Sequence, residues 1–106
     1  MSTSQETVTK YAPHADPKVV DAMASTYRLA LSNRDAATVS ASEPAELVTV
    51  RENFLKKKLG LTDSNETLDK AIKEVLASMK DGSPNPRLAV YYLLAEKFNK
   101  LGVFRN

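Results

Sequence analysis

The sequence predicts an all-α domain, and three observations lead to this fold class. Apolar residues recur in four long segments at the three- and four-residue intervals of amphipathic helices. The chain has three glycines, Gly60, Gly82 and Gly102, and each follows one of these segments, where helices commonly end. No stretch alternates apolar and polar residues for long enough to indicate a strand. Residues 1–106 are therefore expected to form a single compact helical domain.

The first two helices are separated by a proline-containing loop. Thr3 and Glu6 have the spacing of a capping box, so a short helix should precede Pro13. The second helix should begin with Asp16 as its cap and Pro17 in its first position. Its apolar side is expected to contain Val19, Val20, Met23, Tyr27, Ala30 and Leu31. The connector after it has room for one helical turn, at residues 35–39.

The third helix contains an unusual arginine and a run of lysines. It should start at a Ser42 cap and run to about Leu59, before Gly60. Arg51 falls among apolar positions of the helical wheel, which predicts a structural anchor paired with a carboxylate or a helix end, or else a ligand-binding arginine or one that extends to the surface. The triplet Lys56–Lys58 points three different ways, so a solvated helix end that complements the helix dipole is the simplest interpretation.

The fourth helix should follow a second capping box, formed by Asp63 and Glu66, and end before Gly82. It carries a narrow apolar stripe of Leu68, Ile72, Val75, Leu76 and Met79. Its wet side should carry the favourable i,i+4 pairs Glu66–Lys70 and Asp69–Lys73.

The last helix should be capped by Asn85, start at Pro86 and run to Gly102. It is apolar on two faces, which is typical of a helix at the centre of a bundle. Alternatively, Leu88 and Tyr92 form an exposed surface for a partner or for self-association. Because the loops differ in length, we expect an orthogonal array of four main helices plus a short N-terminal helix, with the last helix central.

Composition excludes several function classes. There is no cysteine, so disulfides, thiolate metal sites and thiol nucleophiles are excluded. No apolar run is long enough for a membrane helix, and the polar N-terminus lacks a signal-peptide pattern, so a cytoplasmic protein without membrane association is expected. The only histidine, His14, stands in no catalytic motif, and no cofactor or metal is expected.

The net charge of +2 is unevenly distributed, with a balance of −2 in residues 1–50 and +4 in residues 51–106. A dedicated nucleic-acid protein is usually more basic, so nucleic acid is not an expected partner. A weak anion or nucleic-acid site nevertheless remains an alternative. Its candidate patch is made of Lys56, Lys57, Arg87, Lys97 and Lys100.

Three stretches, KYAPHADPKVVDAM, VRENFLKKKLGL and YYLLAEKFNKLGVF, resemble a family of small bacterial proteins classed as a domain of unknown function. The resemblance implies a compact array of about five helices and no established activity, cofactor or catalytic residue. A non-catalytic interaction or structural domain, with an unknown protein partner or self-association, is therefore the favoured hypothesis. Weak anion binding and a small carboxylate-based enzyme are the alternatives.

Overall fold

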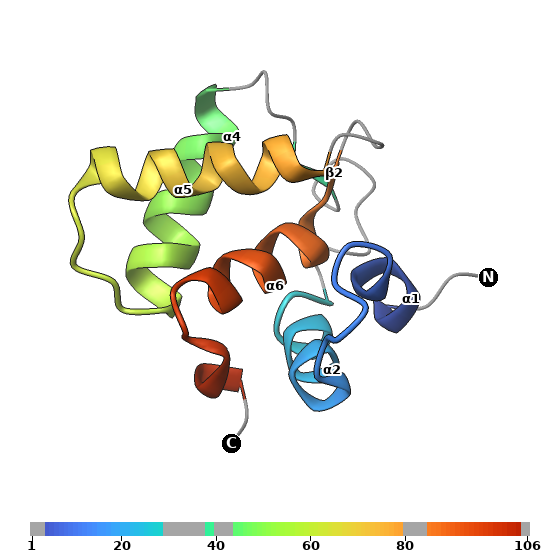
Figure 1. Ribbon diagram of the computed structural model, residues 1–106. Helices are drawn as coiled ribbons and strands as arrows, with labels where there is room; N and C mark the ends of the chain where they lie inside the picture. The colour runs from blue at the N-terminus through green and yellow to red at the C-terminus, as the bar shows by residue number, and fades with distance from the viewer. Residues whose placement is uncertain (1–3, 29–37, 40–43, 80–84, 105–106) are drawn as a thin grey trace.

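The computed structural model describes residues 4–28, 38–39, 44–79 and 85–104, and it confirms the all-α fold (Figure 1). In chain order the helices are α1 (Ser4–Thr9), α2 (Pro17–Thr26), α4 (Pro44–Thr49), η1 (Val50–Lys58), α5 (Asn65–Ser78), α6 (Arg87–Lys97) and η2 (Leu101–Phe104). Two short strands, β1 (Thr38–Val39) and β2 (Asn85–Pro86), pair antiparallel. The radius of gyration is 12.6 Å, which is the compactness expected of a chain of this length.

Helix α6 is central, as its two apolar faces predict. Figure 1 shows it passing between α5 on one side and α1 and α2 on the other, and it also contacts η1, η2 and both strands. Its buried side chains surround the helix: Arg87, Leu88, Ala89, Val90, Tyr91, Tyr92, Leu94 and Ala95. A helix buried over most of its surface in this way organises the elements that pack around it.

Four aromatic rings form a junction where α2, η1, α6 and η2 meet. Phe54 and Tyr91 are stacked, with ring centroids 4.0 Å apart and an angle of 10° between their planes. Tyr27 meets Tyr91 edge-on at 5.0 Å, and Phe104 lies 6.4 Å from Phe54. Such ring pairs add about 0.5–1.5 kcal/mol each beyond the burial of their area.

The starts of α2 and α5 follow local capping chemistry, with one correction at α5. Asp16 caps α2, as predicted, by accepting a hydrogen bond from the backbone N–H of Lys18 at 3.0 Å. The cap of α5 is Ser64 and not the predicted Asp63, because the Ser64 hydroxyl accepts from the N–H of Thr67 at 3.2 Å. The predicted capping residues Thr3 and Ser42 lie outside the described residues.

The third predicted helix is correct in extent but changes type at Val50. Its second part, η1, is a π-helix, in which each N–H bonds to a carbonyl five residues earlier. The buried residues of this segment are separated by four, one and four positions: Val50, Phe54, Leu55 and Leu59. The apolar stripe of an α-helix has spacings of three, one and three, so each turn here is one residue wider. The segment ends as predicted at Gly60, whose φ of 70° is left-handed.

The last helix ends earlier than predicted. Helix α6 stops at Lys97, and Asn99, three residues before the predicted end at Gly102, adopts a left-handed φ of 57°. The N–H of Lys100 donates to the carbonyl of Ala95 at 2.7 Å, and that of Asn99 donates to Glu96 at 3.0 Å. These two bonds form a Schellman motif, in which asparagine tolerates the left-handed position better than most residues.

The connectors were predicted without strands, and here the structure corrects the sequence analysis. Thr38 pairs with Pro86 and Val39 with Asn85, so residues 38–39 form a strand where a helical turn was possible. Asn85 is therefore not the predicted cap of α6; Pro86 occupies the N-cap position without a side-chain hydrogen bond. Residues 35–37 and Gly82 lie outside the described residues. Within the described ranges, no helix has both the length and the apolar character needed to cross a membrane.

Candidate functional site

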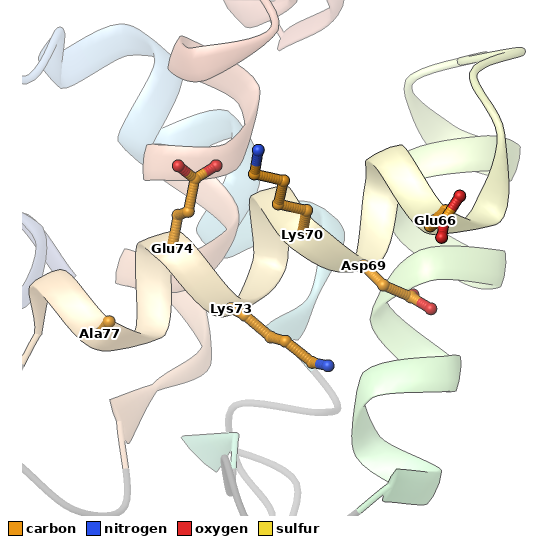
Figure 2. Close-up of a pocket in the computed structure, with 6 residues that line it drawn as sticks. All are labelled: Glu66, Asp69, Lys70, Lys73, Glu74 and Ala77. Atoms are coloured by element: carbon orange, nitrogen blue, oxygen red, sulfur yellow. The ribbon is translucent and has the colours of Figure 1, made fainter.

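An open hollow of about 480 Å³ lies along the solvent side of α5 (Figure 2). Its lining residues, which we call the α5 face, are Glu66, Asp69, Lys70, Lys73, Glu74 and Ala77. Figure 2 shows Lys70 and Glu74 projecting from one side of the helix and Asp69 and Lys73 from the other. The face arises from the amphipathic sequence of α5, because these positions fall opposite the buried stripe.

Arg51 fixes one edge of the α5 face. Its Nη1 donates to both carboxylate oxygens of Asp69, at 3.1 and 3.0 Å, and its Nε donates to Glu52 at 2.8 Å. Only 16% of the Arg51 side chain is exposed. The arginine therefore joins η1 to α5, which is the arrangement that a structural anchor requires, and Asp69 pairs with it across the helices.

The hydrogen bonds of this network favour the charged forms of Arg51 and Glu52. Hydrogen bonds to Glu52 and then to Asp69 raise the pKa of Arg51 above its usual value. Hydrogen bonds from Arg51 and then from Lys56 lower the pKa of Glu52, and the Lys56 ammonium lies 2.9 Å from the Glu52 carboxylate. This part of the surface is held by mutually satisfied charges.

A smaller hollow of about 230 Å³ lies between α5 and α6. An ion pair and a histidine–carboxylate hydrogen bond border it. The Lys97 ammonium is 3.6 Å from Glu74, and the His14 Nε2 is 2.6 Å from a carboxylate oxygen of Glu96. His14 is an exposed loop residue, 68% of whose side chain faces solvent, so this pair tethers the loop between α1 and α2 to α6.

Arg87 is the buried charge of the molecule's described core, with 6% of its surface exposed. Its Nη2 donates to both oxygens of Glu46, at 3.2 and 2.9 Å, and its Nη1 donates to the Tyr91 hydroxyl at 2.8 Å. A longer bond of 3.4 Å reaches the carbonyl of Thr38. Arg87 thus connects α4, β1 and α6 through hydrogen bonds that satisfy a buried guanidinium.

Burial also changes the acidity of the two tyrosines at the aromatic junction. Desolvation raises the pKa of Tyr91 above its usual value, against the opposing effect of the neighbouring Arg87 charge. Burial, followed by the repulsion of an ionised Tyr91, raises the pKa of Tyr27 still further. Both phenols are therefore neutral at physiological pH, where each packs as a ring with a hydroxyl and carries no charge.

The comparison with protein families decides the classification. The family model described as Protein of unknown function (DUF2853) matches residues 4–102. The chain belongs to the DUF2853 family. The resemblance seen in the sequence is thereby confirmed at the level of the family. A comparison with curated proteins gives no match.

The predicted interaction surface of this DUF2853 domain is not exposed. Leu88 is 3% exposed and Tyr92 is 1% exposed. The Tyr92 hydroxyl accepts a hydrogen bond from the backbone N–H of Asp16 at 2.9 Å, so it serves the cap of α2. Both residues belong to the core, because neighbouring elements cover the sides of α6 on which they lie.

The five cations of the predicted anion patch are not assembled into one site. Arg87 is buried against Glu46, Lys56 pairs with Glu52 and Lys97 faces Glu74. Lys57 is exposed on η1 and Lys100 is half-buried after α6. The lysine triplet is divided as well, because Lys58 lies over the Phe104 ring at 5.2 Å from its centroid.

Sequence reasoning identified the opposite charges along α5 but not the surface that they form. The signal was present, because the expected pairs Glu66–Lys70 and Asp69–Lys73 lie within the α5 face. What the sequence could not supply is that Asp69 pairs with Arg51 across to η1. Among the described residues of this DUF2853 domain, no three His, Asp or Glu side chains come together as metal ligands would.

Proposed function

We propose that this DUF2853 domain is a non-catalytic protein-interaction domain and that the α5 face is its contact surface. The observation that carries the proposal is the open hollow along α5, which is lined by three acids and two lysines in close proximity. Opposite charges placed in a fixed pattern give an interface its register and its partner choice more than its raw affinity. The Arg51 anchor supports the proposal because it holds one edge of this pattern against η1.

A carboxylate-based enzyme is the alternative that the same surface raises, because three acids line the hollow: Glu66, Asp69 and Glu74. Acid–base catalysis needs carboxyl groups that converge on a substrate and have separated pKa values. Here Asp69 is bound by Arg51 and Glu74 faces Lys97, while lysines stand between the acids. These pairings favour recognition by charge over acid–base chemistry.

The proposal is tested by affinity purification from the natural host with three baits. The first is the wild-type chain, the second is Lys70→Glu/Lys73→Glu on the α5 face, and the third is Lys57→Glu/Lys58→Glu on η1. The second and third baits carry the same change in charge. We expect the wild-type bait and the η1 variant to recover the same partner proteins, and the α5 variant to lose them. Identical recovery by all three would show that the α5 face is not the contact surface.

A further inference from the structure

We infer that the partner of the α5 face is a second copy of this chain, with the two α5 helices antiparallel about a two-fold axis. The inference rests on the proposed function and names its partner. It is argued from charge complementarity between the α5 face and its own copy, at positions that the structure fixes.

Each side of the α5 face carries one acid and one lysine four residues apart, with their order reversed between the sides. One side has Asp69 followed by Lys73, and the other has Lys70 followed by Glu74 (Figure 2). A two-fold axis perpendicular to two antiparallel helices brings the same side of each helix together with its sequence reversed. Each acid then lies opposite a lysine of the partner copy.

The charge pairs on both sides of the α5 face are matched by nearly the same position of the two-fold axis. The midpoint of Asp69 and Lys73 is Ala71, and that of Lys70 and Glu74 is Ile72. An axis between these two levels is within half a residue of both, or about 0.8 Å along an α-helix. One axis therefore satisfies four ion pairs: two between Asp69 and Lys73, and two between Lys70 and Glu74.

The middle of the face fits the same axis. Glu66 and Ala77 are equidistant from the level between Ala71 and Ile72, so the long side chain of one copy lies over the small one of the other. The hollow of about 480 Å³ leaves room for these side chains to interdigitate, and the lysine stems supply apolar surface to the contact. A parallel pairing in register would instead place each charge against its own copy, which is repulsive.

Exposed ion pairs are individually weak and are screened by salt. The dimer should therefore form at high protein concentration and low ionic strength. The experiment is sedimentation equilibrium of the wild-type chain up to about 1 mM protein, in about 0.01 M and about 1 M salt, between which the screening length falls from about 30 Å to about 3 Å. We expect a mass that rises with concentration toward the dimer at low salt and stays monomeric at high salt.

Two charge reversals identify the face. Lys70→Glu leaves acids at both positions of its side, and Glu74→Lys leaves lysines at both, so each variant repels its own copy. We expect the dissociation constant of each to rise at least about tenfold, and an equimolar mixture of the two to regain the wild-type association. Neither change touches the Arg51–Asp69 pair, and circular dichroism checks that both variants are folded. The control is Lys57→Glu, which has the same charge change outside α5 and should associate like the wild type.

A wild-type chain that stays monomeric at low salt would overturn the inference, and so would a mixture that stays monomeric while the wild type associates. The affinity purification reports separately on the proposed function. If the chain is a monomer but captures another protein through the α5 face, the second copy is the wrong partner and the interaction surface stands.

Discussion

At the scale of single residues, the most consequential group is Arg87. A guanidinium with 6% exposure is retained in the core because Glu46, Tyr91 and the Thr38 carbonyl accept its hydrogen bonds. Removing one partner of a buried pair leaves an uncompensated charge, which costs more than the pair itself contributes. The Arg87–Glu46 pair therefore links α4 to α6 through a buried contact.

We expect Glu46→Gln to lower the free energy of unfolding by about 2–3 kcal/mol, somewhat less than for a fully buried pair because Glu46 is 26% exposed. Urea denaturation measures this change. In an Arg87→Met background the same substitution should cost at least about 1 kcal/mol less, because the guanidinium that Glu46→Gln leaves unpaired is no longer present. Glu66→Gln on the exposed α5 face is the control. Equal costs at Glu46 and Glu66 would argue against the buried pair.

The tyrosines at the aromatic junction predict the alkaline behaviour of the chain. Because the folded state raises the pKa of Tyr91, the free energy of unfolding is unaffected below the unfolded pKa of about 10. Above that pH the unfolded state loses a proton that the folded state keeps. Stability then falls by about 1.4 kcal/mol per pH unit for this residue, until the folded pKa is reached.

Tyrosine absorbance measures the same effect directly, since the chain has no tryptophan. In a spectrophotometric titration of the folded protein, Tyr27 and Tyr91 should ionise later than a free tyrosine. Tyr91→Phe should remove one of these late transitions and reduce the loss of stability at high pH. Four tyrosines that all ionise near pH 10 in the folded state would refute this assignment.

At the scale of the elements, the two described glycines, Gly60 and Gly102, have different roles although each follows a Lys-Leu pair in the sequence. Gly60 is left-handed and ends η1, whereas Gly102 lies in η2 without a left-handed φ. A Cβ atom would meet nothing within 4 Å at either position. Backbone conformation alone therefore decides the effect of a substitution.

Gly60→Ala should lower the free energy of unfolding by about 1–2 kcal/mol, the cost of a left-handed L-residue. Gly102→Ala should be neutral or raise it by up to about 1 kcal/mol, because it reduces the entropy of the unfolded chain. Thermal or urea unfolding of the two variants side by side makes the comparison. If both substitutions were equally destabilising, Gly102 would have the left-handed role that its sequence suggests.

Local signals predicted the helices well, and non-local contacts explain what was missed. The cap at Asp16 and the stripe of α5 depend on residues within a few positions of one another, so the sequence contains them. The early end of α6 at Asn99 and the strand at Val39 depend on how the chain packs. Glu46 could not be predicted as the partner of Arg87, because 41 positions separate the two residues.

At the scale of the whole molecule, the buried residues form one cluster around α6. The rings of the aromatic junction come from η1, α6, η2 and the residue that ends α2, so they report on the contact of four elements. The candidate site, by contrast, lies on one helix and is held by one arginine. The sequence therefore predicted the central helix, but it could not show that Leu88 and Tyr92 are buried, since exposure depends on the whole assembly.

We expect the chain to unfold in a single cooperative transition. Far-UV circular dichroism, which reports the helices, and the near-UV signal of the tyrosines should give the same urea midpoint. The reason is that loss of α6 packing removes the support of every helix that contacts it. A near-UV signal lost at lower urea than the helical signal would instead indicate a state with helices but without fixed packing.

The wide turns of η1 have a consequence for chain length. Its buried set of Val50, Phe54, Leu55 and Leu59 becomes the usual stripe of an α-helix if one residue is removed on each side of the Phe54–Leu55 pair. A double deletion of Asn53 and Lys57, both exposed, would therefore keep the same four side chains inward in a tighter coil. We therefore expect the loss of two residues here to change the pitch of this helix while its contribution to the core is kept.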